Sequence, residues 1–188
     1  MTVLAVGLAL FLGIHLVPIA QPLRTRWRTG LGERGYRIAF SVVSAVGLGM
    51  IIVGWWLAGP GPALFPPSAL AQRSAPYAMT VAFILLASSH SPSHIRAKVK
   101  HPMLIGVIIW ALVHLFANGD TRGTLVFGAL LAYGIVDLIS VVARRAVAVF
   151  EPRARADIIS VVAGTVVALL VMTFHRVLFG HPAVPFSL

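Results

Sequence analysis

The 188-residue sequence contains no cysteine and only five acidic residues. The lack of cysteine excludes disulfides, zinc–thiolate sites, iron–sulfur clusters and covalently attached c-type haem. A bound metal or haem would therefore need His, Met, Tyr or carboxylate ligands. Charged residues are also scarce, at 11% of the chain against about 25% in soluble domains. Because 59% of the residues are hydrophobic, the composition is typical of a polytopic membrane protein.

Apolar runs of membrane-spanning length recur along the chain. A helix needs about 20 apolar residues to cross a hydrocarbon core of ~30 Å. Lipid admits only helices or closed barrels, and the alternating pattern of barrel strands is absent. We therefore predict an all-α fold, a single transmembrane domain over residues 1–188 that forms a polytopic helical bundle of six spans. The expected spans are 2–20, 37–58, 75–90, 102–118, 123–143 and 158–179.

Basic residues set the expected orientation. Twelve of the fifteen Lys and Arg residues fall between the first and second, third and fourth, and fifth and sixth spans. The positive-inside rule places these loops in the cytoplasm and both termini on the non-cytoplasmic side. We expect a protein integral to the bacterial inner (cytoplasmic) membrane, with the lipid bilayer as its partner. The net charge of +10 indicates orientation and not nucleic-acid binding, because the basic residues are interleaved with spans.

The connection between the second and third spans is rich in proline. Proline removes a backbone donor and clashes inside a helix. The sequence therefore predicts a stiff, non-helical cap from Gly59 to Pro76 on the non-cytoplasmic side. Small residues in the second span, among them Gly47 and Gly54, are expected to permit close approach of another helix.

Two histidines, His15 and His114, lie inside predicted spans. An ionisable group inside a span is a candidate functional residue, because burying it is costly. Histidines on separate helices can hold a flat cofactor, and haem b needs only axial ligands and an apolar slot. Trp110, one turn before His114, would line that slot. The two histidines differ by about 10 Å in expected depth, so one ligand with the other nearby is an alternative. A packing role, with each imidazole bonded to a carbonyl, also stays open.

Asp137 is the only carboxylate well inside a predicted span, and Tyr133 lies one turn before it on the same face. A carboxylate that accepts from the second nitrogen of a ligating histidine fixes its tautomer. We therefore expect Asp137 to contact His15. The alternative is an ion pair with Arg144 or Arg145 near the interface.

The remaining histidines are expected to lie outside the hydrocarbon. His90 and His94 have the spacing of a helical metal pair, but Pro92 separates them and no carboxylate is near in the sequence. A solvated loop is the favoured interpretation. His175 and His181 are expected to face lipid headgroups at the opposite end of the bundle.

An ordered set of segments resembles the NnrU family of integral membrane proteins. The set consists of His15 with residues 22–24, then 32–37 (GERGYR), 40–47, 101–106, Trp110, His114 and 118–120. The resemblance covers roughly residues 1–145. It implies an integral membrane protein associated with denitrification and nitric oxide metabolism in bacteria.

The NnrU family is in turn similar to the plant 15-cis-zeta-carotene isomerase, a haem b membrane enzyme. His101 and His114 are separated here as two histidines are in the plant motif. The resemblance implies that the two haem-ligating histidines of the plant enzyme fall at His15 and His114. Ala111 and Tyr133 stand where the plant enzyme has a cysteine and a further histidine.

These observations lead to three hypotheses about function. The first is a membrane protein that binds haem b and has an accessory, redox or nitric-oxide-linked role in nitrogen-oxide metabolism. The second is a haem-dependent cis–trans isomerase of a carotenoid or another polyene, which leaves open whether the protein is an enzyme. The third is a cofactor-free assembly factor or small transporter, although the paired half-helices of many transporters are absent from the pattern.

Overall fold

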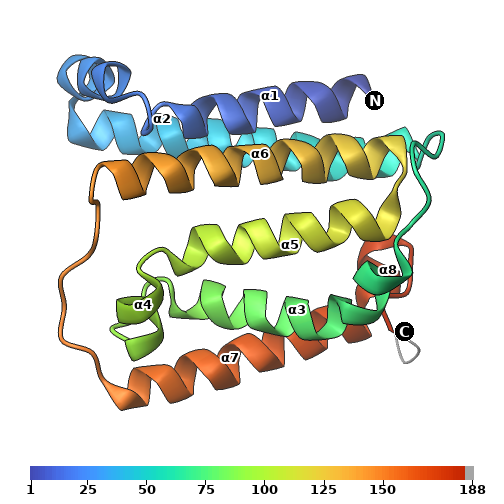
Figure 1. Cartoon of the computed structure of the whole chain (residues 1–188). Helices are drawn as coiled ribbons and strands as arrows, with labels where there is room; N and C mark the ends of the chain where they lie inside the picture. The colour runs from blue at the N-terminus through green and yellow to red at the C-terminus, as the bar shows by residue number, and fades with distance from the viewer. Residues whose placement is uncertain (185–188) are drawn as a thin grey trace.

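The fold is entirely helical, as predicted. The computed structural model describes residues 1–184, and the predicted domain extends beyond them into 185–188. Six long helices run along a common direction (Figure 1), with one isolated β-bridge in the described residues, between Ala63 and Asp120. The helices are α1 (Thr2–Leu16), α2 (Gln21–Ala58), α3 (Ala69–Ser88), α4 (His94–Val99), α5 (Pro102–Asn118), α6 (Thr121–Ala143), α7 (Ala154–Thr173) and α8 (His175–Phe179).

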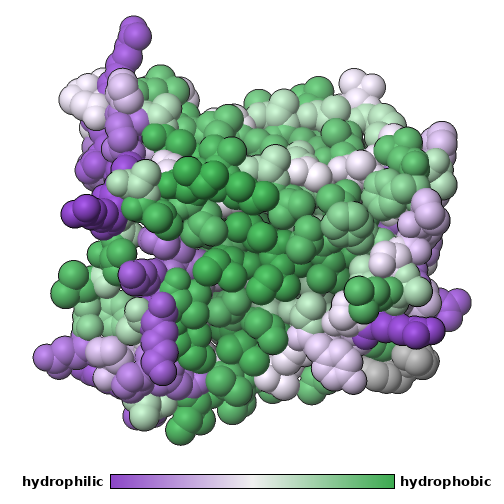
Figure 2. Space-filling view, in the orientation of Figure 1, coloured by the Kyte–Doolittle hydropathy of each residue, from purple (hydrophilic) through white to green (hydrophobic). Residues whose placement is uncertain are grey.

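The outer surface of the helices is apolar. Helices α2, α6 and α7 are long and apolar enough to cross a membrane, and α1 and α5 are shorter apolar helices. Large aliphatic side chains on them face outward, including Leu57 (71% exposed) and Ile139 (64% exposed). Figure 2 shows a broad hydrophobic band between more polar ends. Such a large exposed apolar surface is suited to lipid and not to water. The bundle is therefore that of an integral membrane protein.

The long helices form two groups of three. In the first trio, α1 packs along α2 and also contacts α6; in the second, α3 packs between α5 and α7. The contact between α5 and α6 joins the trios. Figure 1 shows the N-terminus, α8 and residues 59–68 at one end of the bundle, here named the capped end. The bend of α2, α4 and the connection 144–153 lie at the other, the arginine-rich end.

Two glycines of α2 allow α1 to approach closely, which confirms the prediction from small residues. A Cβ atom added at Gly54 would lie 2.5 Å from the backbone nitrogen of Leu4, and one at Gly47 would lie 2.7 Å from that of Phe11. Real Cβ atoms do not come so close to a backbone. The α1–α2 contact therefore depends on the absence of side chains at these positions.

The predicted boundary between the first two spans was wrong. Helix α1 ends at Leu16 and not at residue 20, and the expected loop up to residue 36 is mostly the first part of α2. That arginine-bearing part is separated from the apolar part by a bend at Gly32, where φ is 69° and ψ is 166°. Such backbone angles are nearly exclusive to glycine. The chain therefore changes direction at Gly32, which is the only residue of α2 with non-helical backbone angles.

The predicted start of the third helix was also wrong, because Pro76 lies inside α3. Ser68 caps this helix by accepting a hydrogen bond from the backbone nitrogen of Ala71 (3.3 Å). Thr80 donates its hydroxyl to the carbonyl of Pro76 (2.8 Å). Nearby Ser or Thr hydroxyls help a membrane helix to accommodate proline. The proline rule therefore extended the non-helical cap eight residues too far, to Pro76 and not Ser68.

The cap itself is shorter than predicted and is held to the turn between α5 and α6. The backbone nitrogen of Leu64 donates to the carbonyl of Gly119 (2.8 Å), and that of Thr121 donates to the carbonyl of Pro62 (3.0 Å). At the opposite end, residues 144–153 form an extended connection from α6 to α7 (Figure 1). The predicted last span, 158–179, is divided between α7 and α8.

Candidate functional site

His114 lies half-buried on α5 among aromatic rings. Its Nδ1 donates to the carbonyl oxygen of Trp110 (2.8 Å), and its ring centroid is 5.2 Å from that of Trp110. The Phe127 ring of α6 lies 4.9 Å away. A carbonyl oxygen can only accept, so Nδ1 carries the proton of the neutral imidazole and Nε2 retains its lone pair. A ring fixed in this way is typical of metal-ligating histidines.

A second histidine lies beside His114. The ring of His175 is 6.5 Å from that of His114, with 25° between the planes. Its Nδ1 donates to the carbonyl of His181 (2.6 Å), so its Nε2 is likewise the nitrogen that can coordinate a metal. The sequence predicted that His175 would face lipid headgroups. It did not predict that His175 would lie beside His114. No local pattern could have done so, because His175 and His114 are far apart along the chain.

His15 occupies a similar environment in the first trio. Its Nδ1 donates to the carbonyl of Phe11 (2.6 Å). Its ring lies 4.2 Å from the Phe11 ring, 5.0 Å from Phe40 and 5.8 Å from Tyr133. The tautomer is therefore the same as that of His114, with Nε2 available as a ligand atom.

The structure does not bring His15 and His114 into contact. On α6 the neighbour of His15 is Tyr133, whereas the neighbour of His114 is Phe127. These α6 positions are six residues apart, which corresponds to about 9 Å along a helix. Within residues 1–184 no ring contact links the two histidines. Their separation along the bundle thus agrees with the depth difference expected from the sequence.

Asp137 reaches His15 only through Tyr133. The Tyr133 hydroxyl donates to Oδ2 of Asp137 (3.0 Å), and the Tyr133 ring packs edge-on against His15. In the described part of the chain Asp137 makes neither the expected hydrogen bond to His15 nor an ion pair with Arg144. Arg144 instead donates to the carbonyl of Ser140 (3.2 Å). Tyr133 and Asp137 therefore form a polar pair beside His15.

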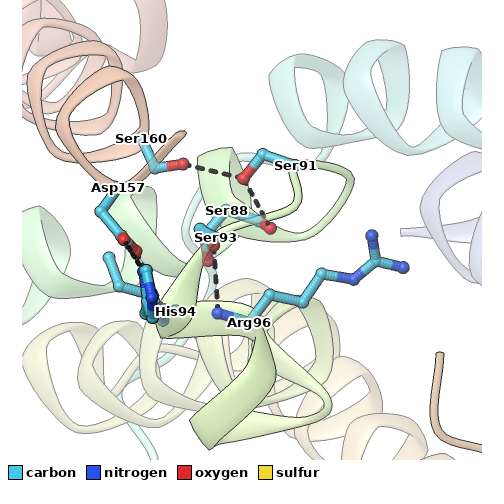
Figure 3. A network of polar contacts seen from close by, with 8 residues as sticks. Ser88, Ser91, Ser93, His94, Arg96, Asp157 and Ser160 are labelled. Atoms are coloured by element: carbon cyan, nitrogen blue, oxygen red, sulfur yellow. Dashed lines mark hydrogen bonds and ion pairs between the residues drawn. The ribbon is translucent and has the colours of Figure 1, made fainter. Parts of the chain in front are cut away.

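A separate polar network lies at the arginine-rich end (Figure 3). His94 Nδ1 lies 2.6 Å from Oδ2 of Asp157, and the backbone nitrogen of Ile95 donates to Oδ1 of the same carboxylate (3.0 Å). The Ser91 and Ser160 hydroxyls are 3.0 Å apart. We expected no carboxylate near His94. This was wrong, because the first turn of α7, which is distant in the sequence, places Asp157 beside His94. The network attaches α4 to α7.

The donor set bears on both metal and haem binding. Among residues 1–184 no three His, Asp or Glu side chains gather as a metal-binding group. A haem needs fewer protein ligands, because the porphyrin supplies four nitrogens. His114 offers a neutral imidazole with a fixed tautomer, and Trp110 and Phe127 form apolar walls around it. The residues at His114 therefore fit a haem ligand site.

These features define an all-helical membrane protein with imidazoles packed between its helices. Its sequence matches the NnrU protein family over residues 3–183. The chain therefore belongs to the NnrU family. The match extends beyond residue 145, where we expected the resemblance to end. Neither a curated protein nor a solved structure matches the chain.

Proposed function

We propose that this NnrU-family protein binds haem b between its helices, with His114 as an axial ligand. The supporting observation is the imidazole of His114, which is fixed by the Trp110 carbonyl and surrounded by aromatic rings. A histidine inside a membrane span is rarely retained without a role. Trp110 and Phe127 shield the site from water, and the Nδ1 hydrogen bond increases the basicity of the ligating nitrogen.

The second ligand is either His175 or His15. The His175 ring contacts the His114 ring, with 6.5 Å between the centroids. The ring contacts of His15 are with Phe11, Phe40 and Tyr133. We therefore place His175 first. His15, with Tyr133 and Asp137 beside it, is the ligand expected from the family resemblance, and it requires α1 to shift along α6.

We further propose that all six long helices cross the membrane and that residues 1–188 form one domain. The first part of α2, α4 and residues 144–155 carry most of the basic residues. The positive-inside rule therefore assigns the arginine-rich end to the cytoplasm and both termini to the other side, in the bacterial inner membrane. Helices α1 and α5 have 15 and 17 residues and match a locally thinned bilayer.

The role that fits this site is accessory and linked to nitrogen-oxide metabolism. A haem iron with a displaceable ligand supplies a binding site for nitric oxide and can exchange one electron. His175 is suited to be the displaceable ligand, because it is the first residue of the short helix α8, which has only five residues. The association of the NnrU family with denitrification supports this assignment.

The test is an absorption spectrum of the detergent-purified protein from haem-replete cells, with and without dithionite. We expect a Soret band in the wild type and its loss in His114→Ala. His90→Ala is the matched control, because the His90 ring is exposed and bonds only to Ser89 among the described residues. A colourless wild type would overturn the proposal in favour of a cofactor-free assembly factor or transporter. Conversion of a cis-carotene in cells expressing the chain would assign the isomerase instead.

A further inference from the structure

Arg122 is a buried cation near the capped end, and the histidine site does not use it. It stands in the first turn of α6 and is only 6% exposed. Its Nη1 donates to the carbonyl of Trp55 (2.8 Å), and its guanidinium carbon lies 3.9 Å from the centroid of the Trp55 ring. Its backbone nitrogen donates to the carbonyl of Pro60 (3.2 Å), which lies in the proline-rich cap.

These contacts leave one nitrogen of the guanidinium, Nε, buried without a partner. Arginine has five N–H donors, and the Nε of Arg122 is buried without a hydrogen-bond partner. The indole Nε1 of Trp55 is also buried without a partner. The ion pairs of residues 1–184 involve Glu33 and Asp157, and none includes Arg122. Asp120 uses Oδ1 to cap α6 by accepting from the backbone nitrogen of Gly123 (2.7 Å), and its carboxylate also attracts the Arg122 charge without forming an ion pair.

A structural role accounts for part of this arrangement. Trp55 is among the last four residues of α2, whose carbonyls lack partners within the helix. A cation at a helix C-terminus is favourable, so Arg122 caps α2. One neutral donor would suffice for the carbonyl, however. The two unpaired N–H groups, Nε of Arg122 and Nε1 of Trp55, remain to be explained, because each costs free energy when it is left without an acceptor.

We propose that Arg122 and Trp55 form a receptor for an anionic oxygen of a carboxylate or small oxyanion. Such an oxygen would accept a charge-assisted hydrogen bond from Nε of Arg122, and Nε1 of Trp55 offers a second unpaired donor. The receptor is two ring contacts from His114, since Trp55 packs on Phe127 (5.8 Å) and Phe127 on His114 (4.9 Å). A haem bound at His114 carries propionates that could supply the carboxylate. A haem propionate as the ligand depends on the proposed function, because it requires bound haem. A free oxyanion as the ligand does not depend on the proposed function.

The experiment has one arm for each source and uses the full-length protein in detergent. In the first, the unfolding temperature is followed against sodium formate and, at equal ionic strength, against sodium chloride. We expect a larger, saturable rise with formate in the wild type and its loss in Arg122→Gln. Arg73→Gln is the control, because it removes an exposed arginine from the first half of α3. Trp55→Phe, which retains the carbonyl and an aromatic ring, should weaken the response.

In the second arm, haem b and its dimethyl ester are titrated into the apoprotein. We expect the ester, whose propionates are neutral, to bind about tenfold more weakly to the wild type. Arg122→Gln should bind both forms with equal affinity. Discrimination in this arm assigns the receptor to the haem carboxylate, and a formate response alone assigns it to a free oxyanion. If neither form of haem binds, the proposed function fails and the formate arm alone decides.

The receptor is overturned if wild-type protein responds equally to formate and chloride and also fails to discriminate the two haems. This outcome would leave Arg122 as a cap of α2. Both comparisons use wild-type protein, so the decision does not depend on Arg122→Gln being folded. Arg122→Lys, which keeps the charge but loses Nε–H, should give an intermediate formate response.

Discussion

The imidazole of His175 lies nearly parallel to that of His114, with the ring centroids 6.5 Å apart. The two rings come from α8 and α5, and each is fixed by an Nδ1–H bond to a backbone carbonyl. Both therefore present Nε2 as the free nitrogen. Two ligand sets are therefore possible, His114 with His175 or His114 with His15. They can be distinguished by mutation, because His15 lies in the other trio of helices.

The first prediction concerns these ligands. We expect His175→Ala to retain haem but to change its absorption and electron paramagnetic resonance spectra from a six-coordinate to a five-coordinate form, because one of two axial imidazoles is lost. His181→Ala is a matched control, since His181 contributes only its backbone carbonyl to His175. If His15→Ala produces the change and His175→Ala does not, the His15–His114 pair is correct.

The second prediction concerns Tyr133 and Asp137. Tyr133→Phe removes the hydroxyl that donates to the half-buried Asp137 carboxylate (3.0 Å). Loss of that donor should lower the free energy of unfolding by about 1–3 kcal/mol, measured by chemical denaturation in detergent. Adding Asp137→Leu should restore much of the loss, because replacing both partners with apolar groups leaves no orphaned acceptor. A double variant as unstable as Tyr133→Phe would show that the loss does not come from an unpaired Asp137 carboxylate.

The third prediction concerns the packing of α1 against α2. Gly54→Ala should lower the free energy of unfolding by about 1–3 kcal/mol, since its Cβ would lie 2.5 Å from the backbone of Leu4. Gly49→Ala on the same helix is the control, because no atom lies within 4 Å of its added Cβ. That variant should be neutral or more stable by roughly 0.5–1 kcal/mol. Equal effects of the two substitutions would show that α1 can move away from α2.

The fourth prediction is a pH dependence at the bend of α2. The guanidinium groups of Arg37 and Arg28 hold the pKa of the Glu33 carboxyl below its usual value. A carboxyl with a lowered pKa stabilises the fold above its unfolded pKa, near 4.3, and this contribution is lost as the pH falls through the folded pKa. Glu33→Gln should therefore lower the unfolding temperature at neutral pH. The difference from wild type should shrink below about pH 4 and, because the pairs are exposed, at high salt.

The fifth prediction concerns the attachment of α4 to α7. Asp157→Ala removes the acceptor of both His94 and the Ile95 backbone nitrogen, so amide hydrogen exchange should accelerate in residues 94–99. Asp157→Asn keeps an oxygen for Ile95 and should have a smaller effect. His90→Ala serves as a control in the same loop. Unchanged exchange in Asp157→Ala would show that packing alone holds α4.

Sequence patterns were sufficient for much of the helical architecture. The apolar runs located five of the six long helices to within six residues at each end, because hydrophobic length is a strong local signal in membrane proteins. The helix boundaries that were predicted wrongly depend on single residues. Gly32 bends a helix that we expected to begin later, and Pro76 is accommodated in α3, where Thr80 bonds to its carbonyl. Such accommodation depends on neighbouring groups that a proline rule does not consider.

The candidate site was less predictable, since its contacts join distant parts of the chain. His15, His114 and Tyr133 could be selected because polar residues inside apolar runs are conspicuous. Their partners could not be selected, as with His175 beside His114 and Asp157 beside His94. Arg122 also looked like an ordinary flanking arginine in the sequence. Only the packing of Trp55 over it reveals a buried charge.

The connection from α2 to α3 and the turn from α5 to α6 both cross between the trios at the capped end, and hydrogen bonds fasten them to each other. At the arginine-rich end the only crossing among residues 1–184 is the extended stretch 144–153. The chain therefore tethers the two trios twice at the capped end and once, by a segment without helical structure, at the arginine-rich end. Their relative position is fixed most firmly beside Arg122, whose backbone nitrogen joins the fastening by bonding to the carbonyl of Pro60.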